Sequence, residues 1–198
     1  MIFLGGCNLR CPTCHNFELA WNMESQPLFA RSKLLLFLAE RKRWLNGVTV
    51  TGGEATCAPG LGELLYEIRK IGLPVKLDSN GMRPEILAEA LDSGLAEHCA
   101  VDVKGPYALY PALSGDRVTA AEARRNLESV FAQAERRPGA FSFRLTRVPG
   151  LTGDDIETAR GYLPAGHTLT LQTYRAPRRA NAHADHEARR PVGNVVNG

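Results

Sequence analysis

Residues 48–81 have the sequence VTVTGGEATCAPGLGELLYEIRKIGLPVKLDSNG, and this stretch predicts a strand, a helix and a second strand. Residues 48–51 and 73–79 are short segments with β-branched or alternating apolar side chains, which is typical of strands. Between them, residues 61–71 repeat apolar side chains at spacings of three and four, the pattern of an amphipathic helix. This order predicts two parallel strands joined by a helical crossover.

The same alternation continues on both sides of this unit. Further strands are expected at residues 2–4, 97–103, 141–146 and 167–171. Further helices are expected at residues 29–45, 84–93, 119–136 and 154–162, with Thr119 and Asp154 as candidate N-caps. Six strands separated by helices predict an α/β fold with one parallel sheet, and we expect a partial (β/α)6 TIM-like barrel rather than a flat sheet.

The length and composition indicate one folded domain. The chain has 198 residues, of which 44% are hydrophobic and 23% are charged, and these values exclude a disordered or fibrous protein. The longest apolar run, residues 34–39, is far shorter than the roughly 20 residues that cross a bilayer. The first residues also lack the basic and apolar regions of a signal peptide. We therefore expect a cytoplasmic protein without a membrane partner.

The last residues differ in composition from the rest. We expect residues 1–174 to form the barrel and residues 175–198 to form a flexible tail rich in Arg and Ala. The net charge of the whole chain is +3, and the tail alone, with five arginines and two acidic residues, accounts for that excess. A neutral body argues against a broad surface for nucleic acid, so no nucleic-acid partner is expected.

Three of the five cysteines, Cys7, Cys11 and Cys14, have the spacing C-x3-C-x2-C directly after the first predicted strand. An odd number of cysteines, concentrated in this way, favours a metal centre in a reducing compartment over disulfides. Three thiolates suit an iron–sulfur cluster or zinc and leave one coordination position for another ligand. His15 is a candidate for that position in a zinc site, although its ring is tethered beside Cys14 in an awkward geometry.

Polar residues and glycines follow or end four of the other predicted strands. In barrels and open α/β sheets, ligands bind where the carboxyl ends of the strands meet, so these residues and the cysteines are expected to surround one cavity. The residues are Gly52, Gly53, Glu54, Asp78, Ser79, Asp102, Lys104 and Arg144.

One group of these residues suits an amino acid. Gly52 and Gly53 allow the backbone to approach a ligand closely, and their peptide groups can bond its polar end. Glu54 is expected to face an ammonium group, and Lys104 is expected to bind a carboxylate.

A second group suits a ribose. Asp78 and Ser79 offer acceptors for hydroxyl groups, and Asp102 lies two residues before Lys104 on the same face of a strand. Arg144 presents a planar fork of donors for a carboxylate or for the ribose and carboxyl end of a ligand. The two groups together predict a zwitterionic nucleoside ligand.

These segments resemble the radical S-adenosylmethionine (SAM) superfamily over residues 1 to about 175. By this resemblance, Cys7, Cys11 and Cys14 bind three irons of a 4Fe-4S cluster, and the amino and carboxylate groups of SAM chelate the fourth. The reduced cluster would cleave SAM to methionine and a 5'-deoxyadenosyl radical that removes a hydrogen atom. The resemblance also implies that Asn16 and Arg175 contribute to cofactor binding.

Within the superfamily, the segments CNLRCPTCHN, DSNG and VDVK and the residues from Arg144 to Gly150 resemble glycyl-radical-enzyme activases. The longer anaerobic ribonucleoside-triphosphate reductase activating proteins are the most similar of these. The resemblance implies a glycyl radical enzyme as partner, such as anaerobic ribonucleotide reductase, and a flavodoxin or ferredoxin-type reductant. One departure is Ala55, which replaces the proline that usually follows Gly-Gly-Glu.

Two alternatives remain open at this point. One is a radical SAM enzyme that modifies a small molecule or a peptide. The other, from a different class, is a non-catalytic module that binds zinc or an iron–sulfur cluster.

Overall fold

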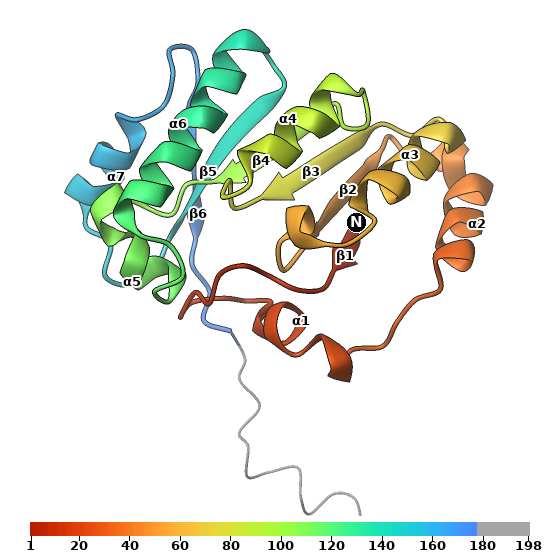
Figure 1. Cartoon of the computed structure of the whole chain (residues 1–198), viewed down its shortest axis with the longest axis horizontal. Coiled ribbons are helices and arrows are strands. Elements are labelled where there is room, and N and C mark those ends of the chain that lie inside the picture. Colours follow the sequence, from red (N-terminus) through yellow and green to blue (C-terminus); the bar gives the residue numbers. More distant parts are fainter. Residues whose placement is uncertain (178–198) are drawn as a thin grey trace, which may run out of the picture.

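The computed structural model describes residues 1–177 and contains one sheet of six strands (Figure 1). The strands pair in chain order from β1 to β6, and every pair is parallel. Within residues 1–177 the edge strands β1 and β6 do not pair with each other, which excludes a closed barrel, and the predicted α/β fold with six parallel strands in a partial barrel is confirmed. The strands are β1 (Ile2–Leu4), β2 (Val48–Gly52), β3 (Val75–Ser79), β4 (His98–Asp102), β5 (Phe141–Arg147) and β6 (Leu169–Thr173).

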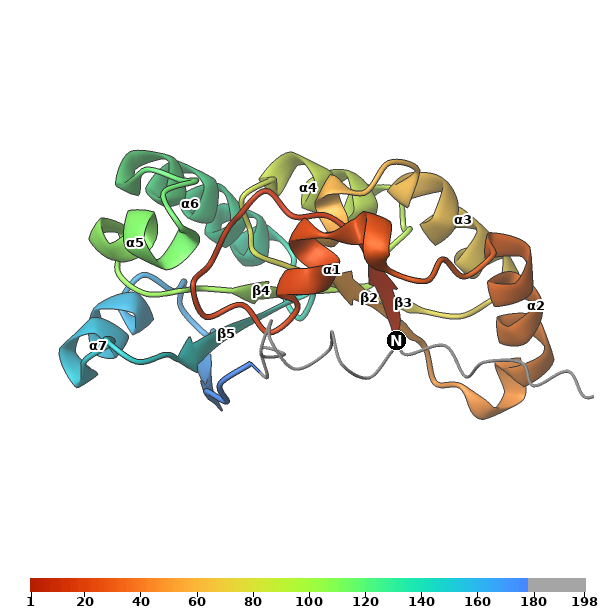
Figure 2. The ribbon, with the colours of Figure 1, turned by 90° about the horizontal axis from the view of Figure 1, so that it is seen from below.

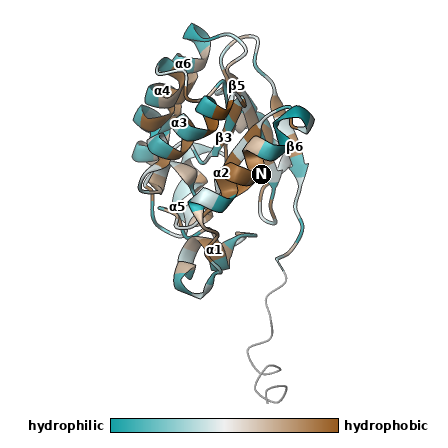
Figure 3. Ribbon diagram, turned by 90° about the vertical axis from the view of Figure 1, so that its right-hand side faces the viewer, coloured by the Kyte–Doolittle hydropathy of each residue, from teal (hydrophilic) through white to brown (hydrophobic). Residues whose placement is uncertain are grey.

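The helices connect the strands, and α3, α4 and α6 lie together on one side of the sheet (Figure 2). Figure 3 shows that these three helices carry hydrophilic residues on the sides that point away from the sheet. The helices are α1 (Phe17–Trp21), α2 (Arg31–Arg41), α3 (Leu61–Ile71), α4 (Pro84–Asp92), α5 (Tyr110–Ser114), α6 (Ala120–Arg136) and α7 (Gly153–Arg160).

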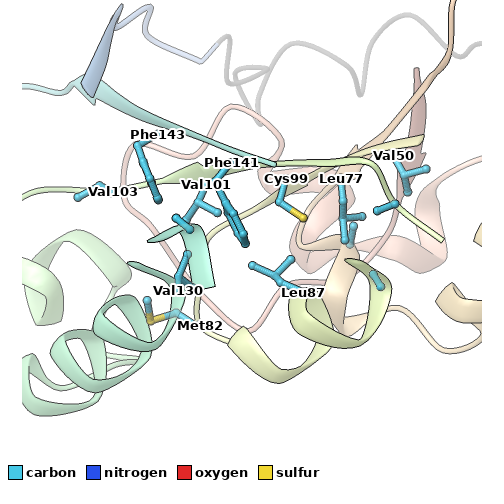
Figure 4. Close-up of a cluster of buried hydrophobic side chains, with 14 of the residues drawn as sticks. Val50, Leu77, Met82, Leu87, Cys99, Val101, Val103, Val130, Phe141 and Phe143 are labelled. Atoms are coloured by element: carbon cyan, nitrogen blue, oxygen red, sulfur yellow. The ribbon is translucent and has the colours of Figure 1, made fainter. Parts of the chain in front are cut away.

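The hydrophobic core lies between the sheet and these helices. Side chains from the central strands, including Leu77, Val101 and Phe143, point toward Leu87 of α4 and Val130 of α6 (Figure 4). All five of these side chains have an exposed fraction of 0%. Successive side chains of a strand point to opposite faces of the sheet. The residues directly before and after each of these core residues in its strand therefore lie on the other face, away from this core.

The structure confirms one of the two predicted N-caps and corrects the other. Thr119 caps α6: its hydroxyl accepts a hydrogen bond from the Glu122 backbone N–H, and the Glu122 carboxylate accepts one from the Thr119 N–H. The prediction of Asp154 as a cap is wrong, because Thr152 caps α7 with its hydroxyl on the Asp155 N–H. Asp154 instead lies in the first helical turn, where a carboxylate interacts favourably with the helix dipole.

Several predicted boundaries also differ from the structure. The expected helix at residues 29–45 is the shorter α2, followed by a 3-10 turn at Lys42–Trp44. The strand expected from residue 73 begins at Val75, after Pro74, which has no N–H to donate to a ladder. Helices α1 and α5 were not expected, since each spans only 5 residues, too few to show a helical period.

No helix in the described part of the chain is long and apolar enough to cross a membrane. Of the tail expected at residues 175–198, residues 178–198 lie outside the described residues. The described residues 175–177 follow β6 without helix or strand.

Candidate active site

A cavity of about 250 Å³ lies at the carboxyl ends of the strands. It is lined by the loop after β1, by the ends of β2, β3 and β4, and by side chains of β5. Every site residue expected from the sequence lines it except Arg175. These residues are Cys7, Cys11, Cys14, Asn16, Gly52, Gly53, Glu54, Asp78, Ser79, Asp102, Lys104 and Arg144.

The cysteine loop, residues 6–16, is fixed from its middle by contacts with other elements. Leu9 is 1% exposed, and its carbonyl accepts a hydrogen bond of 3.0 Å from Trp21 Nε1. The Arg10 N–H donates to the Ser114 carbonyl at the end of α5, at 2.8 Å. A Cβ on Gly115 would lie only 2.2 Å from the Arg10 carbonyl oxygen, so this close approach requires a glycine.

The three thiols of this loop line the same cavity and are half-buried. Burial raises the pKa of Cys7 to about 11 and also raises the pKa of Cys14 above its ordinary value. A metal cation that binds these sulfurs must therefore displace protons, as is general for thiolate ligands.

The placement of the thiols also bears on the kind of metal centre. Among residues 1–177, no three His, Cys, Asp or Glu side chains converge as ligands of a single metal ion. A 4Fe-4S cluster needs no such convergence, because each thiolate binds a different iron atom. Three thiols from one loop that line one cavity fit that donor set.

Gly52 and Gly53 bring the end of β2 against the chain that leaves β1. The Gly53 N–H donates to the Leu4 carbonyl at 3.0 Å, and the next N–H, of Glu54, donates to the Gly6 carbonyl at 2.8 Å. A Cβ would lie 2.0 Å from the Leu4 carbonyl oxygen at Gly52 and 2.1 Å from that of Gly6 at Gly53. The glycines are thus required by this contact between two backbone segments, in addition to the ligand approach expected from the sequence.

Glu54 is 2% exposed, and its carboxylate is hydrogen-bonded within the protein. One oxygen accepts from the Thr56 hydroxyl at 2.7 Å and the Ser79 hydroxyl at 2.8 Å, and the other accepts from the Asn80 N–H at 2.6 Å. Burial raises the pKa of Glu54, although these hydrogen bonds oppose the rise. The carboxylate of Glu54 therefore joins the ends of β2 and β3, and its contact with an ammonium group stays a prediction.

Arg144 connects three strands across the polar face of the sheet. Its guanidinium lies 3.2 Å from an oxygen of Asp78 on β3 and 2.8 Å from an oxygen of Asp102 on β4. Lys76 Nζ lies 3.0 Å from the other Asp78 oxygen. Burial lowers the pKa of Arg144, but Asp102 and Asp78 raise it more, so the guanidinium is charged. The floor of the cavity therefore contains Arg144 between two anions, and Lys76, which does not line the cavity, pairs with Asp78 from outside it.

Lys104 brings a further positive charge to the cavity. Burial lowers the pKa of its ammonium, but the charges of Cys11 and Asp102 raise it more, and the pKa lies above its ordinary value. The backbone N–H of Lys104 donates to the hydroxyl of the fully buried Tyr110 at 3.0 Å. Within the described residues, no carboxylate oxygen lies within 4.0 Å of the Lys104 ammonium. The ammonium is thus free to pair with an anionic ligand in the cavity.

The two candidates that rested on resemblance alone have different positions. Asn16 lines the cavity, and its Nδ2 donates to the Gly52 carbonyl at 3.0 Å, which joins the end of the cysteine loop to β2. Arg175 is exposed and does not line the cavity. The residue before it, Tyr174, contacts the ring of His15 edge-on with a centroid distance of 6.0 Å.

Sequence reasoning missed a further set of cavity residues. Asn80 could have been predicted from the sequence, because it is a polar residue that follows Asp78 and Ser79 directly after a strand. Leu113 had no such signal, since it lies on α5, and Val148 directly follows β5 but has an apolar side chain. The residues missed are Leu9, Thr13, Thr51, Asn80, Val103, Leu113, Thr146 and Val148, whereas His15, the zinc-site candidate, also lines the cavity.

Comparison with known proteins gives related sequences of two kinds. "Putative glycyl-radical enzyme activating enzyme MJ1227" of Methanocaldococcus jannaschii is 27% identical over 163 residues, which cover 79% of this chain and 65% of that protein. "7-carboxy-7-deazaguanine synthase" of Hyperthermus butylicus is 35% identical over 82 residues, which cover 41% of this chain and 34% of that protein. The chain spans less than two thirds of the length of these curated relatives.

Among solved structures, the crystal structure of Streptococcus suis SuiB bound to S-adenosylmethionine is similar in fold. It matches with a TM-score of 0.62 and 16% identity, over 89% of this chain and 40% of that chain. The family model described as the radical SAM superfamily matches residues 1–163. The chain therefore belongs to the radical SAM superfamily, whose cofactors are a 4Fe-4S cluster and S-adenosylmethionine.

Proposed function

We propose that this protein is a glycyl-radical-enzyme activating enzyme, which removes a hydrogen atom from one glycine of a partner such as an anaerobic ribonucleotide reductase. The observation that carries this proposal is the single cavity at the open end of the partial barrel, where three thiols lie beside the polar strand ends. The relative from Methanocaldococcus jannaschii, which matches along most of this chain, is named as an activating enzyme and supports the proposal.

The thiols of Cys7, Cys11 and Cys14 would hold the 4Fe-4S cluster, because they are the soft ligands that line the cavity. When bound, the reduced cluster and SAM supply a 5'-deoxyadenosyl radical that abstracts hydrogen. We assign the electron donor to the flavodoxin or ferredoxin type. We also assign the protein to the cytoplasm, because free thiols such as these persist in that reducing compartment.

The remaining cavity residues would bind and orient SAM. The Lys104 ammonium is available for the carboxylate of SAM, and the backbone of Gly52 and Gly53 can bond its amino group. Asp78 and Asp102, held in place by Arg144, present carboxylate oxygens toward the ribose. Among the other candidates, Ser79 and Glu54 join β2 to β3, Asn16 fixes the loop, and Arg175 has the weakest support.

The open sheet supports a polypeptide as the hydrogen donor. Within residues 1–177, β1 and β6 each have one neighbouring strand, so the barrel is open along the side between them. In this proposal, a loop of a partner protein approaches the cavity from this side.

A second candidate is a radical SAM enzyme that acts on a small molecule. The 35% identity to the deazaguanine synthase over 82 residues favours it, although that match covers a smaller part of this chain than the activating enzyme does. The non-catalytic module that binds zinc or an iron–sulfur cluster is a third candidate, and metal analysis separates it from the other two.

The test uses anaerobically purified protein with SAM, a reductant and each glycyl radical enzyme expressed alongside it. About four irons and four sulfides per chain are expected, together with a glycyl electron-spin signal in one partner. The Cys11→Ala variant should produce neither the cluster nor the signal. A cluster that cleaves SAM without a glycyl signal in any partner would reject the activating role, and a colourless zinc protein would reject the enzyme itself.

A further inference from the structure

The cysteine loop has no strand or helix of its own. Within the loop, the Leu9 N–H donates to Cys7 Sγ at 3.3 Å, and contacts with other elements fix the loop further. Asn8 is the one residue between Cys7 and the buried Leu9. The side-chain carbonyl oxygen of Asn8 accepts a hydrogen bond of 2.8 Å from Asn80 Nδ2. The same oxygen lies 3.9 Å from the sulfur of Cys7. This bond therefore joins the first cysteine of the loop to the end of β3.

Asn80 itself is fixed on its other sides. It is 6% exposed, its N–H donates to the Glu54 carboxylate at 2.6 Å, and its side-chain oxygen accepts from the Met82 N–H at 3.0 Å. Glu54 is held in turn by the hydroxyls of Thr56 and Ser79. With its backbone N–H and side-chain oxygen both bonded, Asn80 has its side-chain NH2 group left, and this group donates to Asn8.

We propose that Asn80 is a positioning residue for Cys7, which acts through its hydrogen bond to Asn8 and holds the first thiol in place for the iron–sulfur cluster. Asn80 lines the cavity, but its side-chain polar atoms are used for contacts within the protein. The inference rests on the proposed function only in taking Cys7 as a cluster ligand. It does not depend on the identity of the substrate.

Two substitutions remove this bond from opposite sides. Asn8→Ala removes the acceptor, and Asn80→Ser removes the donor while its hydroxyl can still accept from the Met82 N–H. The measurement is the rate at which the anaerobically reconstituted protein releases iron to a chelator, without SAM or a partner enzyme. Each variant is expected to release iron about five- to tenfold faster than the wild type, the factor that corresponds to the loss of one buried hydrogen bond.

A double-mutant cycle distinguishes this role from general destabilisation. If both substitutions act through one bond, the double variant should release iron no faster than the faster of the two single variants. Multiplicative effects, or unchanged release from Asn80→Ser, would overturn the proposal. A wild-type protein that binds no cluster would instead reject the proposed function, so the two failures are distinguishable.

Asn126→Ala provides a matched control. The Asn126 side-chain amide donates to the Met82 carbonyl at 3.3 Å, on the same turn that Asn80 contacts, and Asn126 is half-buried on α6. This variant is expected to lower the melting temperature of the iron-free protein and to release iron at the wild-type rate. Faster release from Asn126→Ala, equal to that from Asn80→Ser, would assign the effect to stability of the turn and contradict a specific role of Asn80.

Discussion

The central strands of the sheet have two faces of opposite character. On the face toward the helices, Leu77 and Phe143 are fully buried among apolar side chains. On the other face, the adjacent residues Asp78 and Arg144 form ion pairs at the floor of the cavity. Side chains alternate between the two faces along each strand. The same strand therefore carries side chains that stabilise the fold on one face and side chains available to a ligand on the other. Substitutions on one face should therefore change stability, and those on the other should change binding and chemistry.

The largest effect is expected for Cys11→Ala on the cavity side. Loss of one of three thiolates should abolish both the cluster and the reductive cleavage of SAM, because iron then lacks a protein ligand at one corner. The side chain is half-buried, so the iron-free protein should unfold within about 0.5 kcal/mol of the wild type. Iron content and cleavage products measure the first effect, and urea unfolding measures the second.

The control for this prediction is Cys57→Ala, a half-buried cysteine that does not line the cavity. It should retain the cluster and cleavage of SAM. Cleavage retained by Cys11→Ala would mean that the cluster ligands are wrongly assigned.

The next largest effect is expected for Phe143→Ala on the core side. Phe143 is 0% exposed and packs against the rings of Phe131 and Phe141, at centroid distances of 5.2 Å and 6.3 Å. Removal of a buried aromatic ring should lower the free energy of unfolding by about 3–5 kcal/mol. Urea unfolding of the iron-free protein measures the loss, and Phe143→Leu should lose less. A loss below about 1 kcal/mol would show that the hydrophobic core tolerates the space left by the removed ring.

A smaller and different effect is expected for Arg144→Met, next to Phe143 on the opposite face. Asp78 and Asp102 lose their shared cation, so the carboxylates no longer have fixed positions for the ribose. We expect the Kd for SAM on the cluster-loaded protein to rise about tenfold, the effect of one lost charge-assisted contact. Anaerobic calorimetry measures the affinity.

Lys76→Met is the control for Arg144→Met. Lys76 also pairs with Asp78, but it does not line the cavity. The Kd for SAM should change by a factor of about five or less, because an exposed ion pair contributes about 1 kcal/mol at most. An equal rise in both variants would indicate that only the charge of Asp78 matters.

The smallest effect is expected at the N-cap of α6, far from the cavity. Thr119→Ala should lower the free energy of unfolding by about 1 kcal/mol, because the hydroxyl no longer accepts from the Glu122 N–H. Binding of SAM should not change. A reduced affinity for SAM in this variant would contradict the separation between the helical layer and the cavity.

The same cap gives a pH dependence with a defined sign. The hydrogen bonds from the Thr119 N–H and hydroxyl lower the pKa of Glu122 below its ordinary value of 4.5. The stabilisation by this carboxylate is therefore complete above pH 4.5 and is lost as the pH falls through the lower pKa of the folded state. The stability difference between the wild type and Glu122→Gln should narrow over that range, as thermal unfolding at several pH values can measure. A difference that does not change with pH would exclude this contribution.

Much of the architecture could be predicted from residue patterns. The apolar periods of residues 61–71 and 119–136 gave α3 and α6 nearly to their ends, and the β-branched segments gave all six strands. The helix boundaries were less predictable, because they depend on which groups accept hydrogen bonds from the free backbone N–H groups of the first turn. At α7, the choice between Thr152 and Asp154 as cap depends on the path of the chain before the helix, which local composition does not specify.

The sequence by itself determined that soft thiolate ligands occur in one short loop and that polar residues follow successive strands. These facts were sufficient to predict that the thiols and the polar residues surround one cavity, because parallel strands bring their carboxyl ends to one edge of the sheet. Only the tertiary structure decided how each polar group is used. It directed Glu54 to Ser79 and Asn80, paired Arg144 with Asp78 and Asp102, and bonded Asn80 to Asn8. Hydrogen bonds and ion pairs act only over a few ångströms, so their partners are set by the packing of segments that are distant in sequence.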